Sequence, residues 1–341
     1  MSKSVVTFGE LMLRLAPDGY YRFLQAKNYG ATYGGGEANV AVSLANFGLN
    51  VRFVSRIPEH EIGQSGVNSL RERGVDTSFI TRGGERIGIY FLEKGASQRP
   101  SKVIYDRKYS AMAEAKDADF DWNKIFEKTQ WFHFTGITPA LSDETAEICL
   151  QACKIAKKKG ITISCDLNFR KKLWAKEKAR KIMGEICKSV DVCIANEEDI
   201  DDVFGIKAKH SDITSGKVNH EDYKEVAKVV TDRFKFSKVA ITLRSSISAN
   251  DNRWSAMIYD GEKFYFSKEY LIHIIDRVGG GDSFGAGLIY SLINDFSSRD
   301  ALEFAVAASC LKHSVEGDFN QMSVDEVLRL VSGDASGRVQ R

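Results

Sequence analysis

Continuous apolar runs recur along the chain, and they limit its fold more than any other feature. They lie at 5–9, 51–57, 131–137, 161–167, 191–196 and 238–243. Such runs are typical of strands buried on both faces, as in a parallel sheet. Helix-length amphipathic segments at 37–48, 143–160 and 220–234 lie between several of them. The alternation predicts an α/β fold with a doubly wound, mostly parallel sheet flanked by helices.

Two segments interrupt this alternation. Residues 10–33 and 85–110 are aromatic, charged and loosely alternating, which is typical of short strands or hairpins. We expect them to meet in space as a small discontinuous β sheet that acts as a lid. The rest divides into a core of 1–9, 34–84 and 111–331 and a polar, flexible tail of 332–341.

Charge and composition exclude several classes of partner. Lys and Arg number 48 against 46 for Asp and Glu, so the net charge gives no electrostatic signature of nucleic-acid or anionic-membrane binding. The N-terminus lacks the apolar region of a signal peptide, and no apolar run approaches the ~20 residues that span a bilayer. The six cysteines show no metal-ligand spacing and are expected to be buried thiols. We expect a cytoplasmic protein without nucleic-acid or membrane partners.

A glycine cluster, "VGGGDSFGAG" at 278–287, stands where a helix is expected to begin. Consecutive glycines let several N–H groups converge, and a helix N-terminus adds partial positive charge. The combination suits a phosphate or a developing oxyanion. The motif is neither a dinucleotide fingerprint nor a Walker A loop. Taken alone, Asp282 is better explained as a helix cap.

A second cluster, "YGGGEANVAVSLANFG" at 33–48, precedes another expected helix. Its glycines allow close backbone approach, and Asn39 adds an amide, which suits a polyhydroxylated ligand. A capped and tightly packed helix explains this motif equally well.

Together and in this order, the two motifs resemble those of the ribokinase-like (PfkB) carbohydrate kinases. The resemblance covers nearly the whole chain and includes "GE" at 9–10 and "ANEED" at 195–199. Within that family, "GELMLRLAP", "YDRKYSA", "DLNFRKKLW" and "LKHSVEGDFN" are most similar to 2-keto-3-deoxygluconate kinases. The family fold is a large α/β domain with a small β lid.

The resemblance implies ATP-dependent phosphorylation of 2-keto-3-deoxygluconate to 2-keto-3-deoxy-6-phosphogluconate, with Mg²⁺ bridging the nucleotide phosphates. Asp282 would be the general base, and the backbone of Gly279, Gly280 and Gly281 would form the anion hole. A kinase for a neutral sugar such as fructose or ribose is an alternative. A non-catalytic sugar-binding regulator on the same fold is another.

The resemblance also implies a set of residues around the sugar. Contacts to substrate are expected from Gly34, Gly35, Asn39, Tyr90, Tyr105, Arg107, Arg170, Asp282 and Asp318. Arg170 follows an apolar run directly, at the strand end where ligands of open α/β sheets bind. Its two-donor fork suits a carboxylate or a phosphate. A surface cation in a basic run with Lys171 and Lys172 is the alternative.

Nucleotide contacts are implied for Asn168, Asn196, Thr242, Arg244, Ser246, Gly279 and Gly281. The chain departs from the family here, because Arg244 and Ile247 replace two glycines of the usual nucleotide loop. Arg244 and the hydroxyls of Ser245 and Ser246 are then expected to hold phosphate.

Three further residues differ from the family pattern. Asp199 stands where the family has a glutamate that organises Mg²⁺ through water. Arg277 and Val278 stand where threonines are common, which weakens an implied monovalent-cation site beside Asp276. The resemblance implies a sugar acid and ATP as partners. The sequence leaves open a homo-oligomer formed through the lid, the stereochemistry of the sugar acid, the nucleotide donor and the monovalent-cation dependence.

Overall fold

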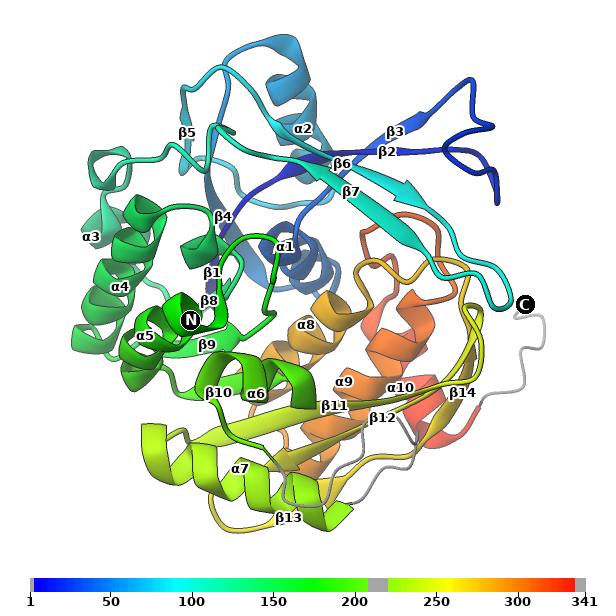
Figure 1. Ribbon diagram of the computed structural model, residues 1–341. Helices are drawn as coiled ribbons and strands as arrows, with labels where there is room; N and C mark the ends of the chain where they lie inside the picture. The colour runs from blue at the N-terminus through cyan, green and yellow to red at the C-terminus, as the bar shows by residue number, and fades with distance from the viewer. Residues whose placement is uncertain (1–2, 208–219, 335–341) are drawn as a thin grey trace.

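The computed structural model describes residues 3–207 and 220–334, which form a large and a small sheet (Figure 1). In this described part the large sheet has ten strands: β1 (Ser4–Phe8), β4 (Asn50–Ile57), β5 (Ile80–Arg82), β8 (Trp131–Thr135), β9 (Thr162–Asp166), β10 (Val192–Ala195), β11 (Lys238–Ser246), β12 (Asp251–Tyr259), β13 (Phe264–Phe266) and β14 (Tyr270–His273). Their order is β13-β12-β11-β10-β9-β8-β1-β4-β5, with β14 beside β12. Neighbours from β11 to β5 run parallel, whereas β12, β13 and β14 form an antiparallel edge.

Helices cover both faces of the large sheet. One face carries α3 (Trp122–Ile125), α4 (Asp143–Lys158), α5 (Lys176–Ile186), α6 (Glu197–Phe204) and α7 (His220–Phe234), with the short η1 (Asp117–Asp119), η2 (Thr138–Ala140) and η3 (Cys187–Ser189) nearby in the chain. The other carries α1 (Gly36–Asn46), α2 (Glu61–Arg71), α8 (Gly280–Ile293), α9 (Ser298–Lys312) and α10 (Val324–Ser332). The predicted doubly wound fold is confirmed.

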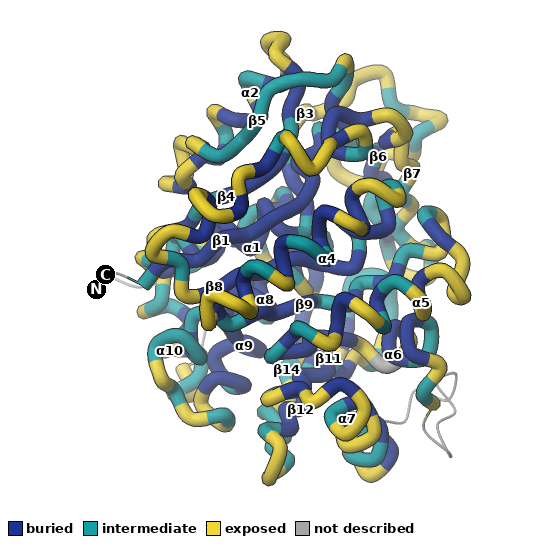
Figure 2. Tube along the Cα trace, turned by 90° about the vertical axis from the view of Figure 1, so that its left-hand side faces the viewer, coloured by how far each residue is buried: buried dark blue, intermediate teal, exposed yellow. Residues whose placement is uncertain are grey.

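Side-chain alternation along the strands explains the two helical layers. In β1, Val6 and Phe8 join the apolar cluster beneath α4 and α5, whereas Val5 joins the cluster beneath α1 and α8. All five residues of β1 are buried, as the continuous apolar run predicts. Figure 2 shows buried residues along the central strands and exposed ones on the outer sides of the helices.

The small sheet is built from the two interrupting segments. Its order is β3-β2-β6-β7, with β2 (Met12–Ala16) and β3 (Gly30–Gly34) from the first segment and β6 (Gly88–Glu93) and β7 (Lys102–Asp106) from the second. It lies at the upper side of the molecule in Figure 1, with the β6–β7 hairpin extending beyond α8 toward β14.

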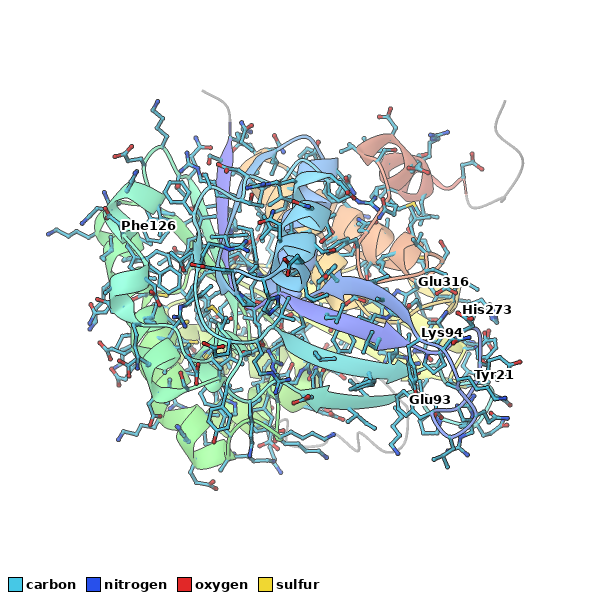
Figure 3. The ribbon with its side chains drawn as sticks, turned by 90° about the horizontal axis from the view of Figure 1, so that it is seen from above. Tyr21, Glu93, Lys94, Phe126, His273 and Glu316 are labelled. Carbon is cyan, nitrogen blue, oxygen red and sulfur yellow. The ribbon has the colours of Figure 1, made fainter. Side chains whose placement is uncertain are left out.

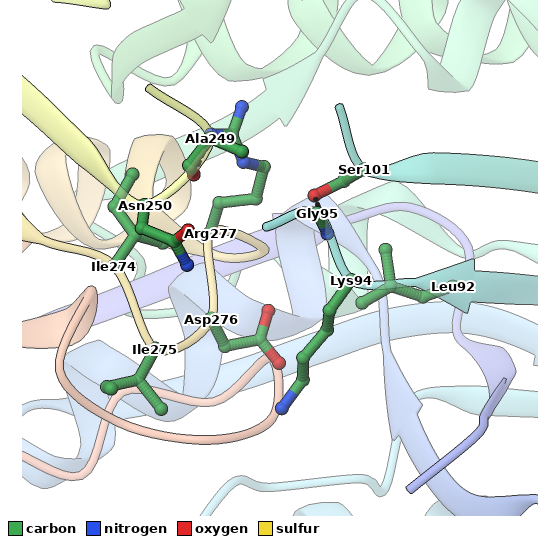
Figure 4. Close-up of a pocket in the computed structure, with 10 residues that line it drawn as sticks. All are labelled: Leu92, Lys94, Gly95, Ser101, Ala249, Asn250, Ile274, Ile275, Asp276 and Arg277. Atoms are coloured by element: carbon green, nitrogen blue, oxygen red, sulfur yellow. Dashed lines mark hydrogen bonds between the residues drawn. The ribbon is translucent and has the colours of Figure 1, made fainter. Parts of the chain in front are cut away.

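The tip of the β6–β7 hairpin contacts the turn between β11 and β12. Ser97 N–H donates to Asn250 Oδ1 over 2.8 Å, and Ala249 N–H donates to Ser97 O over 2.7 Å. Lys94 forms an ion pair with Glu316, and both side chains are labelled in Figure 3. A small pocket between hairpin and core is lined on the core side by Asp276 (Figure 4). These contacts hold the small sheet over the start of α8.

Candidate active site

The two glycine motifs meet at the N-termini of α1 and α8. Asn39 Nδ2, in the first turn of α1, donates to Asp282 Oδ2 over 2.7 Å. The two helices begin so close together that a Cβ on Gly36 would lie 3.7 Å from Asp282 Oδ1. The structure therefore brings the expected sugar motif and the expected phosphate motif into direct contact.

The glycines before α8 are needed for packing and for backbone shape. Gly279 has a φ of 83°, and a Cβ there would lie 2.1 Å from the carbonyl oxygen of Asp318. A Cβ on Gly280 would lie 2.4 Å from the ring of His313. Gly281 faces open space, with no atom within 4 Å of its added Cβ. The loop is thus pressed against the segment after α9 and open at Gly281.

The open side of the loop presents backbone donors. Gly280 N–H makes a long bond of 3.4 Å to the Arg277 carbonyl, and Ser283 N–H closes the first helical turn on Gly279 O over 2.8 Å. The N–H groups of Gly281 and Asp282 stand between them, at positions where a helix offers no acceptor of its own. This end of α8 can bind an anion.

Asp282 is a partly exposed carboxyl in the first turn of α8. Loss of hydration raises its pKa to about 6, and the charges of Asp318 and Glu37 act in the same direction. The hydrogen bond from Asn39 and the charge of Arg170 lower the pKa and only partly offset these effects. A carboxylate with this pKa is ionised at neutral pH and is a stronger base than an ordinary Asp.

Two further carboxyls lie near Arg170: Asp166 ends β9, and Asp199 lies in the first turn of α6, which follows β10. Burial raises the pKa of Asp166 well above its usual range, with the charges of Asp199 and Asp282 adding to it. Burial raises the pKa of Asp199 to about 6. The charge of Arg170 lowers the pKa of all three acids, so its guanidinium lies close to each. The sequence analysis did not predict Asp166 as a site residue, although Asp166 ends a buried strand two residues before Asn168.

Three of the predicted nucleotide contacts lie in or just after strands β9, β10 and β11. Asn196 caps α6 by accepting from Asp199 N–H over 2.8 Å, and Asp199 accepts from Phe169 N–H over 3.0 Å. Asn168 has a φ of 35°, a conformation that Asn tolerates better than most residues. Thr242 Oγ1 donates to Ala195 O over 3.5 Å and so links β11 to β10.

Arg244 and Ser246 lie exposed at the far end of β11. Arg277, which the sequence did not single out as a ligand, donates to Ala249 O over 2.9 Å. Burial lowers the pKa of Arg277, and the nearby charge of Arg244 lowers it further. Two guanidinium groups therefore lie near one another beside the start of α8, which favours an anion between them.

Tyr105 lies near the end of β7, and Arg107 directly follows that strand. The buried Arg107 is bound by Glu10, with its Nε 2.9 Å from Glu10 Oε2. Ser110 donates to the other oxygen of Glu10. Tyr105 is 37% exposed, and its ring lies 5.5 Å from the Arg107 guanidinium carbon and 6.0 Å from the ring of Tyr90. Tyr105 is thus accessible, whereas the charge of Arg107 is already matched by Glu10.

Asp318 is enclosed by residues of the small sheet. Arg14 Nη1 donates to Asp318 Oδ1 over 2.7 Å and Arg14 Nη2 donates to Asp276 Oδ2 over 2.5 Å. Tyr90 donates its hydroxyl to Asp318, and the absence of a side chain at Gly34 makes room for that carboxylate. Gly35 packs as closely, since a Cβ there would lie 2.0 Å from the Glu10 carbonyl oxygen. Arg14 was not foreseen, although it is a charged residue inside an apolar strand.

A cluster of metal ligands and a membrane-spanning helix are both absent from the described residues. The described residues contain no group of three or more His, Cys, Asp and Glu side chains arranged to hold a metal. All six cysteines are free and five are buried. In residues 3–207 and 220–334 no helix has the length and apolarity to cross a bilayer.

A doubly wound sheet with glycine-started helices meeting at a carboxylate, beside an anion-binding helix start, is typical of a phosphotransferase acting on a hydroxyl. Residues 2–324 match the pfkB family carbohydrate kinases over nearly the whole chain. The protein belongs to this family and is a carbohydrate kinase, which confirms the resemblance seen in the sequence.

Three individual proteins show which members of the family the chain is similar to. The crystal structure of 2-dehydro-3-deoxygluconokinase from Thermotoga maritima is 52% identical, with a TM-score of 0.94 over 97% of this chain and 100% of that one. The 2-dehydro-3-deoxygalactonokinase of Haloferax volcanii is 30% identical over 99% of both chains. A ribokinase-like protein of E. coli in complex with ATP and Mg²⁺ shares the fold, at 20% identity and a TM-score of 0.80 over 97% of this chain and 99% of that one.

Proposed function

We propose that the protein transfers the γ-phosphoryl group of ATP to the terminal hydroxyl of 2-keto-3-deoxygluconate, also called 2-dehydro-3-deoxygluconate. The contact between Asn39 and Asp282 is the main support, because it places a basic carboxylate between a sugar motif and an anion-binding helix start. The names of the relatives in Thermotoga maritima and Haloferax volcanii favour a keto-deoxy sugar acid.

In the proposed reaction, Asp282 accepts the proton of the substrate hydroxyl as its oxygen attacks the γ-phosphorus. The backbone of Gly279, Gly280 and Gly281 stabilises the charge of the transferring phosphoryl group. Asn39 holds Asp282 in place, and Gly34 and Gly35 contact the sugar through their backbone.

Arg170 is the proposed partner of the substrate carboxylate. Among the described residues its side chain forms no hydrogen bond or ion pair, although three carboxyls lie near it. A bidentate donor that is free to turn toward the site suits a sugar acid. A neutral sugar would leave that charge unused.

Asp166 at the end of β9 and Asp199 after β10, the two acids near Arg170, could hold Mg²⁺. Burial raises the pKa of Asp166 and Asp199, so a cation beside them would favour their ionised form, and their oxygens are the donors that Mg²⁺ prefers. Bound there through water, Mg²⁺ would neutralise nucleotide phosphates. Arg244 and Arg277 would hold the phosphates from the other side.

A coupled ADP-release assay tests the proposed function. The assay compares 2-keto-3-deoxygluconate, its galactonate epimer, fructose and ribose. We expect the keto-acid sugars to exceed the neutral sugars by at least about 10²-fold in kcat/KM, because a desolvated charge pair distinguishes them. Faster turnover of fructose or ribose would favour the neutral-sugar kinase. Tight binding of a sugar without release of ADP from ATP in the presence of any of the four sugars would favour the non-catalytic regulator.

The pH profile should report on Asp282. Because only the ionised carboxylate accepts a proton and its pKa is raised to about 6, kcat/KM should be constant above pH 7 and should fall through the region around pH 6. Asn39→Ala removes a hydrogen bond that lowers this pKa, so its acid limb should move to higher pH. A profile flat down to pH 5, or an acid limb that Asn39→Ala moves to lower pH, would contradict this assignment.

We also propose that the small sheet acts as a lid that excludes water during transfer. Val278 of the glycine loop packs against Met12, Tyr90 and Leu92 of that sheet, so the lid and the loop form a continuous apolar contact. Amide exchange at 10–33 and 85–110 should slow when substrate is added, whereas exchange in the central strand β9 should not change. Unaltered exchange in both segments would contradict a lid.

A further inference from the structure

Lys312, the last residue of α9, is a buried lysine that the proposed mechanism does not use. Its exposed fraction is 0%, and it is the one lysine among the buried residues of the described chain. Its Nζ donates to the carbonyl oxygens of Val315 over 3.2 Å and Asp276 over 3.4 Å. Burying an ammonium group costs stability unless the surroundings match its charge. The position therefore needs a reason beyond packing.

The ammonium lies directly behind the proposed anion hole. A Cβ added to Gly279 would lie 3.1 Å from Lys312 Cε, so the lysine stem passes beneath the glycine loop. Asp276 begins that loop, and Val315 belongs to the segment that packs against it. Asp276 Oδ1 also accepts from Val278 N–H over 3.1 Å, and Asp276 Oδ2 accepts from Gly317 N–H over 3.2 Å. Lys312 thus holds together the two segments that shape the loop.

Lys312 completes a balanced set of four buried charges. Arg14 pairs with Asp276 and Asp318, and all three side chains are at most 4% exposed. Both carboxylates favour the charged form of Lys312, although burial lowers its pKa overall. Without Lys312, two carboxylates would face one cation immediately behind a site for a phosphoryl group. The extra negative charge would oppose the charge that develops in the transition state.

We propose that Lys312 is a positioning residue for phosphoryl transfer, and that its ammonium group serves as a built-in monovalent cation for the carbonyls of Asp276 and Val315. The proposal rests on the proposed function in one respect: the loop at Gly279 must bind the transferring group. Carbonyl oxygens beside carboxylates are also suitable ligands for a free K⁺ or NH₄⁺ ion. Because the lysine already fills this place, the parent protein should not depend on an added ion.

The first test uses the unaltered protein. Its kcat and KM are measured in chlorides of K⁺, Na⁺, NH₄⁺ and choline at a constant ionic strength of about 100 mM. We expect kcat to agree within about twofold in all four salts, since the internal ammonium cannot be exchanged. A requirement for K⁺ or NH₄⁺ over choline of about tenfold or more would overturn the proposal, because a free ion would then be needed.

The second test removes the ammonium. Lys312→Ala should lose about 10²-fold in kcat in choline chloride, the effect expected when a reacting group is misplaced by about 1 Å. K⁺ or NH₄⁺ should restore at least about tenfold of that loss by entering the vacated space, and choline should not. Lys312→Met, which keeps the length of the side chain, should be slowed but not rescued. Lys188→Met, at an exposed ion pair with Glu185, is the matched control for loss of a lysine.

A melting readout separates this proposal from the substrate assignment. NH₄⁺ or K⁺ should raise the Tm of Lys312→Ala relative to choline and leave that of the parent unchanged, whatever sugar the enzyme accepts. Absence of rescue in both kcat and Tm would overturn the proposal. If neither variant at 312 folds, the salt series on the parent decides between the two outcomes.

Discussion

Asp282→Asn is expected to lower kcat by about 10² to 10⁴-fold, the usual contribution of a positioned general base. Binding should change little, because the amide has nearly the same shape and its oxygen can still accept the hydrogen bond from Asn39. What the variant loses is the ability to take the proton of the attacking hydroxyl. The loss should therefore appear in kcat and not in the dissociation constant of the sugar acid.

Single-turnover kinetics and calorimetric titration with the sugar acid measure the two quantities separately. Asp295→Asn is a suitable control. The Asp295 side chain is 94% exposed, pairs with Lys3 at the surface and lies beyond the end of α8 opposite to Asp282. The acid limb of the pH profile should also disappear from the residual activity of Asp282→Asn. Turnover within a few-fold of the parent would remove Asp282 from the chemistry.

The large sheet could be predicted from the sequence because its strands are buried on both faces. That environment leaves a direct trace, a continuous apolar run, and the amphipathic segment 220–234 coincides with α7. The small sheet was also foreseen, since its segments break the alternation. Patterns of this kind involve residues close together in the chain, so they can be recognised without knowing which distant residues are in contact.

The partners of buried charges could not be predicted. Arg14 and its two carboxylates are 262 and 304 residues apart, and no local pattern records such pairs. Arg107 was expected at the substrate, and its role there stays a prediction, but its pairing with Glu10 could be seen only in the structure. Lys312 is similar, because a lysine in the last turn of a helix normally indicates a solvated cation.

Arg170→Ala should mainly affect sugar acids. Losing a charge-assisted contact to a desolvated carboxylate costs roughly 2–5 kcal/mol, which is on the order of 30-fold to several thousand-fold in kcat/KM. Turnover of fructose should change little, because fructose has no carboxylate. Arg170 also lowers the pKa of Asp282, so the comparison is made at pH 8, well above the pKa of about 6 that this acid has in the parent.

Two companion variants decide what the loss means. Arg170→Lys should recover only part of the activity toward the sugar acid, since a point charge cannot make two parallel bonds to a carboxylate. Lys171→Ala, at the exposed neighbouring cation, should behave as the parent. An equal loss on fructose and sugar acid would assign Arg170 to the nucleotide phosphates or to the acids around it. Unchanged kinetics on both substrates would make Arg170 a surface cation, and the choice of a sugar acid would then need another residue.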